Sequence, residues 1–472
     1  MSKYCEEKNI KLTFWIPPCS KELNTIVDDY NLTKERQQFY DDLKMLGEVY
    51  NFNLYEFVVN NKDNFTDPAH FNFEIGNYIY DVIFKSRKSN LKIEQMSLNK
   101  VLILTNPLNH EGGVVNYYNL FFKHFESDII ALKHGSIGSR TYLFYYPVLK
   151  RLLYPFYYLL DVLVYFFTLL FNRRIKIVQV SPSLIPVPLI RDGLLVLIAK
   201  LLGKKVVIFY RGWKLPTYHK IAQRDPLRKL FNFIFQKNTL QVVLASSFKN
   251  DLEKLNPKKK ANIIVTTTAI DKSQIVKLEA HTETKPIKVL FLGRIQDLKG
   301  VGELVDAIGQ LKQMEKLNEF KFSIVGHENK IGYTNELKKK LECYGVKSEK
   351  ADFLGRISGQ EKYQLYANHD IYVLPSYTEG CPNSLLEALA SGLFCITTRV
   401  GALSDIISPK GNGLFVNTKD SEDLLSALLY CSSNKDFNKN RLANADKYSS
   451  EFDIKEITQF FENKYIDLIE HK

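Results

Sequence analysis

Two glutamates lie in the stretch of sequence whose residue types and spacing point most clearly to chemistry. Glu379 and Glu387 belong to residues 375–392, where an apolar run of strand length is followed by a turn and then by a pattern of helix length. The amino terminus of a helix has free backbone N–H groups and the positive end of the helix dipole, so it binds anions such as phosphate. With Glu379 in the turn and Glu387 in the helix, the two carboxylates can reach different parts of one extended ligand.

The first turns of this helix have two interpretations. In one, the backbone amides of Asn383, Ser384 and Leu385 bind the anion, and Glu387 binds another part of the same ligand. In the other, residues 384–387 form a capping box, in which Glu387 only bonds back to the backbone at the start of the helix. The spacing alone leaves both interpretations open.

The elements that position these residues follow from an alternation of strand-length apolar runs with helix-length amphipathic stretches. Such an alternation predicts a parallel sheet covered by helices. Strands are expected at 101–105, 177–180, 206–210, 241–245 and 263–266, and in a second series at 288–292, 321–325, 351–354, 371–374 and 394–397. Helices are expected at 301–314 and 383–390, within the second series. The polar, charged residues 270–286 between the two series suit a linker.

The two series predict an α/β chain with two doubly wound, Rossmann-like domains that face a cleft, with the ligand at the carboxyl ends of their strands. We expect the first domain at residues 100–275, the second at 286–450, and a carboxyl-terminal helix at 451–472 that can cross back to the first. Residues 1–99 do not follow the alternation and form an amino-terminal appendage. Its one convincing strand, at 11–16, is ended by Pro17 and Pro18.

Asp67 and His70 form an Asp-x-x-His block within the appendage. The block resembles the last motif of the SGNH-type hydrolases, in which such a pair orients, and serves as base for, a serine. The glycine-aspartate-serine block of that family is absent upstream, so we interpret residues 1–99 as a degenerate or truncated fragment. The alternative is that Asp67 caps a turn and His70 is an ordinary surface residue.

Residues 152–171 form an aromatic, apolar segment whose length would just cross a bilayer. Asp161 at its centre, Pro155 in its first turn and its many tyrosines argue against a span. We prefer a helix on the membrane surface, with residues 150–176 against acidic lipid, and a buried helix of the first domain is the main alternative. The flanking basic residues are Lys150, Arg151, Arg173, Arg174 and Lys176.

The composition narrows the classes of partner. A net charge of +12 favours nucleic acid, a nucleotide substrate or acidic lipid, but no nucleic-acid-binding module accompanies the charge, and we expect no nucleic acid partner. The chain has 45% hydrophobic and 25% charged residues, as globular proteins have. Its six scattered cysteines lack C-x-x-C spacing and no export signal opens the sequence, so we expect a cytoplasmic protein.

Residues 100–472 resemble the family-four retaining glycosyltransferases, also described as glycosyl transferases group 1. The signature of that family is a pair of glutamates separated by seven residues, in a segment such as E-G-x-x-x-x-x-x-E-A-x-A-x-G. It is present here at Glu379, Gly380, Glu387, Ala388, Ala390 and Gly392. Five further motifs occur in the order of the family, at residues 291–295, 299–300, 323–326, 352–355 and 413–416.

The resemblance implies the GT-B fold, a nucleotide diphosphate sugar as donor, and transfer with retention in a hexosyltransferase-type enzyme (EC 2.4). Negative charge that develops on the departing diphosphate needs a metal or fixed cations. The family uses an arginine and a lysine, here Arg294 and Lys299, and no aspartate-x-aspartate metal motif stands out. We therefore expect neither metal nor cofactor, with Glu379 positioning the sugar and Glu387 binding the ribose. The alternative is that Arg294 and Lys299 are solvated loop cations.

The first domain matches the family less well. Gly112 and Gly113 stand where the family has a glycine-rich loop, and would let the backbone approach the donor phosphate or the acceptor. Arg211 stands where the family often has a histidine; it can bind a phosphate or a sugar hydroxyl but cannot act as a base.

We expect a glycan or polyprenyl-linked acceptor, used in cell-surface polysaccharide synthesis at the inner face of the cell membrane. The alternative function is a catalytically silent GT-B module that binds nucleotide sugar.

Overall fold

The computed structural model describes residues 99–110, 112–137, 147–257, 262–276, 286–434, 437 and 439–470, and short pieces at 13–16, 36–39, 41–42, 48–51, 65–67 and 70–71. The chain divides into two units, Met1–Ser97 and Leu98–Lys472. Each is described by itself.

In the first unit, β1 (Thr13–Ile16) pairs in parallel with β2 (Glu48–Asn51), and β3 (Phe65–Asp67) pairs antiparallel with β4 (His70–Phe71). The strand β1 lies within the stretch expected at residues 11–16. The side chains of Asp67 and His70 lie outside the described residues, so the Asp-x-x-His block stays a prediction.

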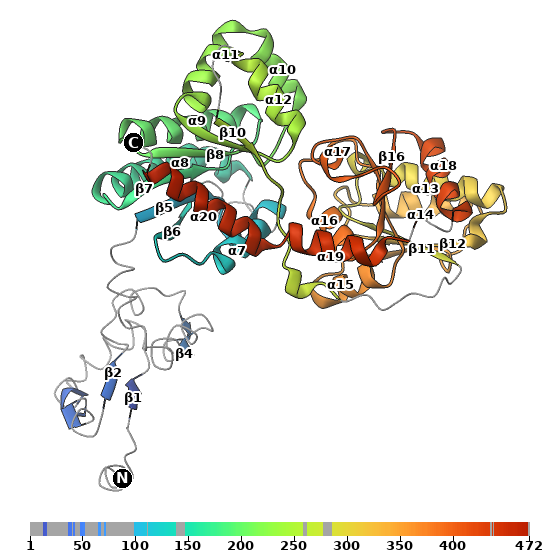
Figure 1. Ribbon diagram of the computed structural model, residues 1–472, viewed down its shortest axis with the longest axis horizontal. Coiled ribbons are helices and arrows are strands. Elements are labelled where there is room, and N and C mark those ends of the chain that lie inside the picture. Colours follow the sequence, from blue (N-terminus) through green and yellow to red (C-terminus); the bar gives the residue numbers. More distant parts are fainter. Residues whose placement is uncertain are drawn as a thin grey trace. The chain divides into compact units, whose positions relative to one another are not determined.

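The second unit opens with a six-stranded parallel sheet in the order β10-β9-β8-β7-β5-β6 (Figure 1). Its strands are β5 (Asn99–Thr105), β6 (Ile130–Ser136), β7 (Ile175–Val180), β8 (Lys205–Phe209), β9 (Thr239–Val243) and β10 (Asn262–Val265). The central strands are almost wholly buried because helices cover both faces, which explains why most of their residues are apolar. The sequence did not indicate β6, an edge strand in which only Ile130 is buried.

Helices connect these strands and are rich in apolar residues on the sides that face the sheet. They are α7 (Gly113–His124), α8 (Pro147–Phe171), α9 (Pro186–Leu201), α10 (Leu215–Gln223), α11 (Asp225–Phe231) and α12 (Ser246–Leu255). A π-helical turn, Asn232–Gln236, follows α11.

The second sheet of this unit repeats the same plan, in the order β13-β12-β11-β14-β15-β16. Its strands are β11 (Ile287–Leu292), β12 (Phe320–Val325), β13 (Ala351–Gly355), β14 (Ile371–Leu374), β15 (Phe394–Thr398) and β16 (Gly413–Val416). The covering helices are α13 (Val301–Gln313), α14 (Tyr333–Cys343), α15 (Gly359–Ala367), α16 (Asn383–Ala390), α17 (Leu403–Ile406), α18 (Ser421–Ser433) and α19 (Arg441–Glu451). The predicted α/β class with two doubly wound domains is confirmed.

The last helix, α20 (Ile454–Glu470), packs against the first sheet and α7 although the chain reaches it from the second sheet (Figure 1). Tyr465 donates to Gln179 Oε1 at 2.7 Å, and the ring of Phe461 lies edge-on against Phe121 with centroids 5.5 Å apart. The chain's own carboxyl terminus therefore ties the two sheets together.

Helix α8 is buried on one side and exposed on the other. Val162, Tyr165 and Leu169 are buried, and Tyr165 donates to the carbonyl of Leu195 in α9 at 3.0 Å. The exposed apolar side chains are Phe156, Leu159, Leu160, Leu163, Val164, Phe167, Leu170 and Phe171. Among the described residues, no helix is long and apolar enough to cross a membrane.

Candidate active site

Two loops at the carboxyl edge of the second sheet are fixed against each other. Gly300, after β11, has a left-handed φ of 70°, and a Cβ at this position would overlap the carbonyl of Pro375, just after β14. The amide of Tyr377 donates to the carbonyl of Leu298 at 3.0 Å. Only glycine fits at position 300, and the close approach brings Lys299 beside Glu379.

Lys299 and Glu379 form an ion pair between these loops. The Lys299 ammonium donates to Glu379 Oε1, and the Ser376 hydroxyl donates to the same oxygen at 2.8 Å. The side chains are only 16% and 9% exposed, so their charges are poorly screened by water. The pair therefore holds a cation and a carboxylate, both partly desolvated, at a fixed position in the loop.

Arg294 lies on the same loop, two residues after β11 ends at Leu292. Its side chain is exposed, and within the part of the chain that the structure describes it makes no ion pair or hydrogen bond. A guanidinium with unused donors can bind the oxygen atoms of a carboxylate or a phosphate.

Helix α16 begins beside this ion pair. Asn383 is its first helical residue, Pro382 precedes it, and no side chain caps the end. The amide of Leu385 donates back to the Pro382 carbonyl at 3.1 Å, so of the three predicted anion donors only the amides of Asn383 and Ser384 remain available. Tyr372 fixes this turn: its hydroxyl donates to the Leu292 carbonyl at 3.0 Å and lies 2.7 Å from Ser384 Oγ.

Glu387 faces α15 and does not cap its own helix. Its Oε1 accepts from Lys362 Nζ at 2.7 Å and its Oε2 accepts from the Tyr366 hydroxyl at 3.0 Å. The capping-box interpretation is wrong, because the helix starts at Asn383 and Ser384 lies inside it. The sequence did not indicate Lys362 and Tyr366 as partners, although their i, i+4 spacing on one helix face could have.

The Glu387 side chain is 10% exposed, and its carboxylate is therefore largely shielded from water. It raises the pKa of the buried Tyr366 hydroxyl further, after the larger effect of burial. Each carboxylate oxygen has a second lone pair, so Glu387 can still accept from a ligand hydroxyl.

On the first domain, Gly112 and Gly113 form the start of α7. Gly112 has a φ of 146°, outside the range that other residues favour, and precedes the first helical residue, Gly113. A Cβ at either position would meet no atom within 4 Å, so the backbone here borders open space.

Arg211 lies between the two domains. Its guanidinium stands 4.1 Å from the ring centroid of Tyr117 and 4.7 Å from that of Phe209, as in cation–π contacts. A Cβ on Gly380, next to Glu379, would lie 3.8 Å from the Arg211 carbonyl and 3.4 Å from Leu244. Arg211 therefore borders the loop that carries Glu379.

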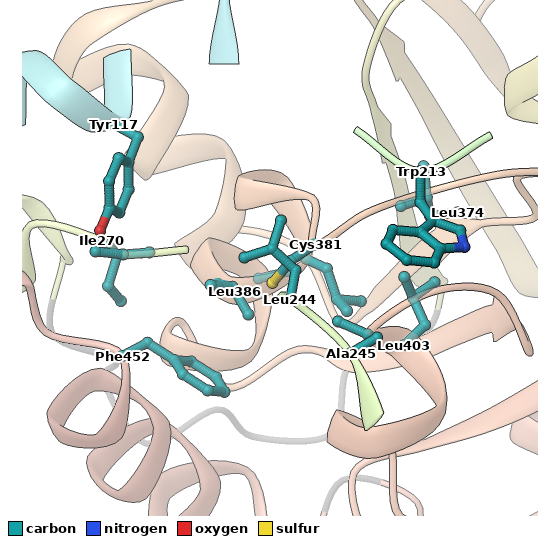
Figure 2. Close-up of a cluster of buried hydrophobic side chains, with 14 of the residues drawn as sticks. Tyr117, Trp213, Leu244, Ala245, Ile270, Leu374, Cys381, Leu386, Leu403 and Phe452 are labelled. Carbon is teal, nitrogen blue, oxygen red and sulfur yellow. The ribbon is translucent and has the colours of Figure 1, made fainter. Parts of the chain in front are cut away.

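The contact between the domains is apolar. Thr268 of the first domain donates to the Cys381 carbonyl of the second at 3.2 Å. Apolar side chains of both domains lie around Cys381 (Figure 2). The cluster in Figure 2 joins Tyr117, Trp213, Leu244, Ala245 and Ile270 with Leu374, Cys381, Leu386, Leu403 and Phe452. The sequence-predicted residues of both domains thus lie at the carboxyl edges of the two sheets.

Known proteins share this second domain and this fold. Residues 286–434 match the family described as glycosyl transferases group 1. An N-acetylgalactosaminyltransferase of Campylobacter jejuni, which acts on N,N'-diacetylbacillosaminyl-diphospho-undecaprenol, is 30% identical over 43% of this chain and 50% of its own length. The sulfoquinovosyl transferase SQD2 of Arabidopsis thaliana is 26% identical over 49% of this chain and 46% of its own length. The chain thus spans about half the length of these curated relatives.

Solved structures extend the likeness to both domains. Sucrose-phosphate synthase of Thermosynechococcus elongatus matches 79% of this chain and 100% of its own, with a TM-score of 0.60 and 15% identity. HepE of Anabaena, solved with UDP and glucose, matches 77% of this chain and 98% of its own, with a TM-score of 0.55 and 15% identity. The resemblance to the group 1 glycosyltransferases and the GT-B fold are confirmed.

Proposed function

We propose that this chain transfers a sugar from a nucleoside diphosphate to an acceptor hydroxyl with retention of configuration, as the match of residues 286–434 to the group 1 glycosyltransferases suggests. The observation that carries the proposal is the partly buried Lys299–Glu379 pair, which lies beside the uncapped amino terminus of α16. The acceptor is a glycan or a lipid-linked glycan of polysaccharide synthesis, and the Campylobacter relative supports a lipid-linked one because it acts on a sugar joined to diphospho-undecaprenol.

The donor lies against the second domain. Its diphosphate accepts from the amides of Asn383 and Ser384, from Arg294 and from Lys299, which turns from Glu379 towards the phosphate when the donor binds. Glu387, held by Lys362 and Tyr366, accepts from the ribose hydroxyls.

The chemical step then needs no general base from the protein. The bond between the anomeric carbon and the phosphate oxygen breaks, its electron pair stays on the diphosphate, and the acceptor oxygen bonds to the anomeric carbon on the same face. The acceptor proton goes to the departing phosphate oxygen. Lys299 and Arg294 stabilise the charge on that oxygen, and Glu379 accepts from the sugar hydroxyls.

A screen of nucleotide sugars tests the proposal. Incubation with UDP-, GDP- and ADP-sugars, read as release of the nucleoside diphosphate, should find one donor that the protein hydrolyses slowly without acceptor and uses faster with one. Donor binding without any release or transfer would favour the silent module instead.

We expect transfer to persist in excess EDTA, because fixed cations and the α16 amino terminus supply the positive charge. Nucleotide release in the presence and absence of chelator measures this, with a metal-dependent transferase treated in parallel as the control. Activity that is lost on chelation and restored by magnesium or manganese would contradict the proposal.

The exposed side of α8 is proposed to lie on the membrane surface where the acceptor is held. Its apolar side chains continue at the carboxyl end into Phe171, which is 78% exposed, and then into the exposed cations Arg173, Arg174 and Lys176. Apolar side chains beside a basic cluster match an acidic lipid surface, where each cation is worth about 1 kcal/mol.

Replacing Phe166 and Phe167 with serine should move the protein from the pellet to the supernatant when it is centrifuged with phosphatidylglycerol vesicles. The variant should stay folded, because Phe167 is exposed and Phe166 is only half-buried. Ile331→Ser, which removes an exposed apolar side chain of the second domain, is the matched control and should still sediment. Global unfolding of the double serine variant would instead support a buried helix.

A further inference from the structure

A small cavity opens at the carboxyl edge of the first sheet. Its volume is about 190 Å³, and its polar lining comprises Thr105, Asn106, Ser181, Ser183, Arg191, Asp192 and Arg211. Thr105 is the last residue of β5, and the others follow β5, β7 or β8 or lie on α9. A volume of this size equals the liquid volume of about six water molecules, enough for one sugar ring.

Asp192 places a buried carboxylate in the wall of this cavity. The residue is 3% exposed, and its Oδ1 accepts from Arg191 Nε at 2.6 Å. Its Oδ2 is also buried, and among the described residues no group donates to it. Burial raises the pKa of Asp192, and Arg191 offsets part of that rise. A buried carboxylate oxygen without a donor costs free energy, which a ligand donor can recover.

Arg211, in the wall of the same cavity, has hydrogen-bond donors without an acceptor among the described residues. Its Nε and Nη1 are buried and find no acceptor within the described part of the chain. Its charge is supported instead by the ring faces of Tyr117 and Phe209. The cavity therefore offers an unused acceptor and unused donors to one ligand.

The unsatisfied acceptor of Asp192 and the unsatisfied donors of Arg211 together indicate which kind of ligand fits the cavity. A phosphate would satisfy Arg211 but would be repelled by Asp192, and an ammonium group would be repelled by Arg191 and Arg211. Neutral hydroxyls donate to the carboxylate and accept from the guanidinium at once. A sugar with neighbouring hydroxyls therefore fits the cavity better than an ion of either sign.

We propose that this cavity binds the terminal sugar of the acceptor, with Asp192 accepting from its hydroxyls and Arg211 donating to them. The inference rests on the proposed transferase function, and it adds Asp192 as a residue that determines which acceptor is used. On the same helix, Val187 and Ile190 are 72% and 77% exposed, so the cavity opens next to an apolar surface that suits a lipid-linked acceptor.

The test uses octyl glycosides of glucose, galactose, mannose and N-acetylglucosamine as acceptors, with single deoxy analogues of the best one. Asp192→Asn should lower kcat/KM for the acceptor by about 10- to 100-fold, since hydrogen bonds to a charged group are worth about 1.5–3 kcal/mol. The loss should fall mainly on KM, and nucleotide affinity should be unchanged. For the wild type, an acceptor that lacks the hydroxyl bound by Asp192 should lower kcat/KM by as much as Asp192→Asn does. For Asp192→Asn, the same deoxy acceptor should lower kcat/KM little further.

Two controls separate binding from folding. The double variant Arg191→Gln/Asp192→Asn removes both charges of the Arg191–Asp192 pair and should keep the melting temperature while losing acceptor affinity. Asp225→Asn alters an exposed Asp–Arg pair of the same domain and should behave as wild type.

Three results would decide against the assignment. Wild-type acceptor kinetics in both Asp192 variants would overturn it, and so would a wild-type protein that hydrolyses donor but takes none of the glycosides. An unchanged penalty for the deoxy acceptor in Asp192→Asn would also overturn it. A protein that neither binds nor cleaves any nucleotide sugar would instead refute the proposed function itself.

Discussion

Lys299→Ala should lower the turnover number by about 10²-fold or more, the usual effect of removing one preorganised donor to a developing charge. The Lys299 side chain is 16% exposed and lies on a loop that Gly300 fixes against Pro375, so water cannot easily replace its ammonium. The affinity for the donor should change less, because the charge that Lys299 stabilises grows only as the diphosphate leaves. Steady-state kinetics with saturating donor measure the difference.

The ion pair with Glu379 requires a control of its own, because Lys299→Ala leaves a partly buried carboxylate whose remaining donor among the described residues is Ser376. The double variant Lys299→Met/Glu379→Gln removes both charges and should melt near the wild-type temperature while staying inactive. Lys316→Ala breaks an exposed lysine–glutamate pair in the same domain and should leave turnover unchanged. Near-normal turnover in folded Lys299→Ala would remove this lysine from the reaction.

Arg294→Ala should act on the same step as Lys299→Ala, but it tests a different environment. Its guanidinium is exposed and has no partner among the described residues, so its removal should leave stability unchanged. A loss of turnover in this variant therefore cannot be attributed to folding.

The elements that the sequence predicted best are those whose surroundings are uniform. The strands β8 and β14 are buried on both faces, so their apolar runs, residues 206–209 and 371–374, are continuous and could be recognised without knowing their neighbours. Helix α16 was predicted at its exact bounds, because the turn before it contains Gly380 and Pro382. The edge strand β6, with mixed exposure, has no such pattern and was missed.

Contacts between residues that lie far apart in the chain could not be predicted from the sequence. Lys299 and Glu379 were both predicted for the site, but their ion pair joins loops 80 residues apart and depends on how β11 and β14 lie side by side. The partners of Glu387 come from α15, and the exact start of α16 decided against the capping box. Asp192 gave no signal, because its importance depends on burial beside Arg191 and on an oxygen that no described group satisfies.

Glu387→Gln should weaken binding of the nucleoside diphosphate by about 10- to 100-fold, as expected when a hydrogen bond worth about 1.5–3 kcal/mol to a charged group is lost. The glutamine keeps the size of the side chain and can still accept from Tyr366, which limits the loss of stability. Turnover at saturating donor should change less, because the ribose is bound about equally in the ground state and the transition state. Calorimetric titration with UDP, GDP and ADP identifies the nucleotide and measures its affinity.

A 2′-deoxy analogue of the preferred nucleotide distinguishes a ribose contact from a structural role for Glu387. The wild type should bind the ribose form more tightly than the deoxy form, and Glu387→Gln should reduce that preference, since the carboxylate that receives the hydroxyl is gone. Lys362→Met is the matched control: it removes the same ion pair from the other side but leaves the carboxylate, so it should lose stability and keep the preference. If Glu387 only holds α15 and α16 together, Glu387→Gln and Lys362→Met will lower the melting temperature alike and both will keep the preference for ribose. That result would take Glu387 out of the donor site, and the family resemblance would then describe how these helices pack without describing how the nucleotide is bound.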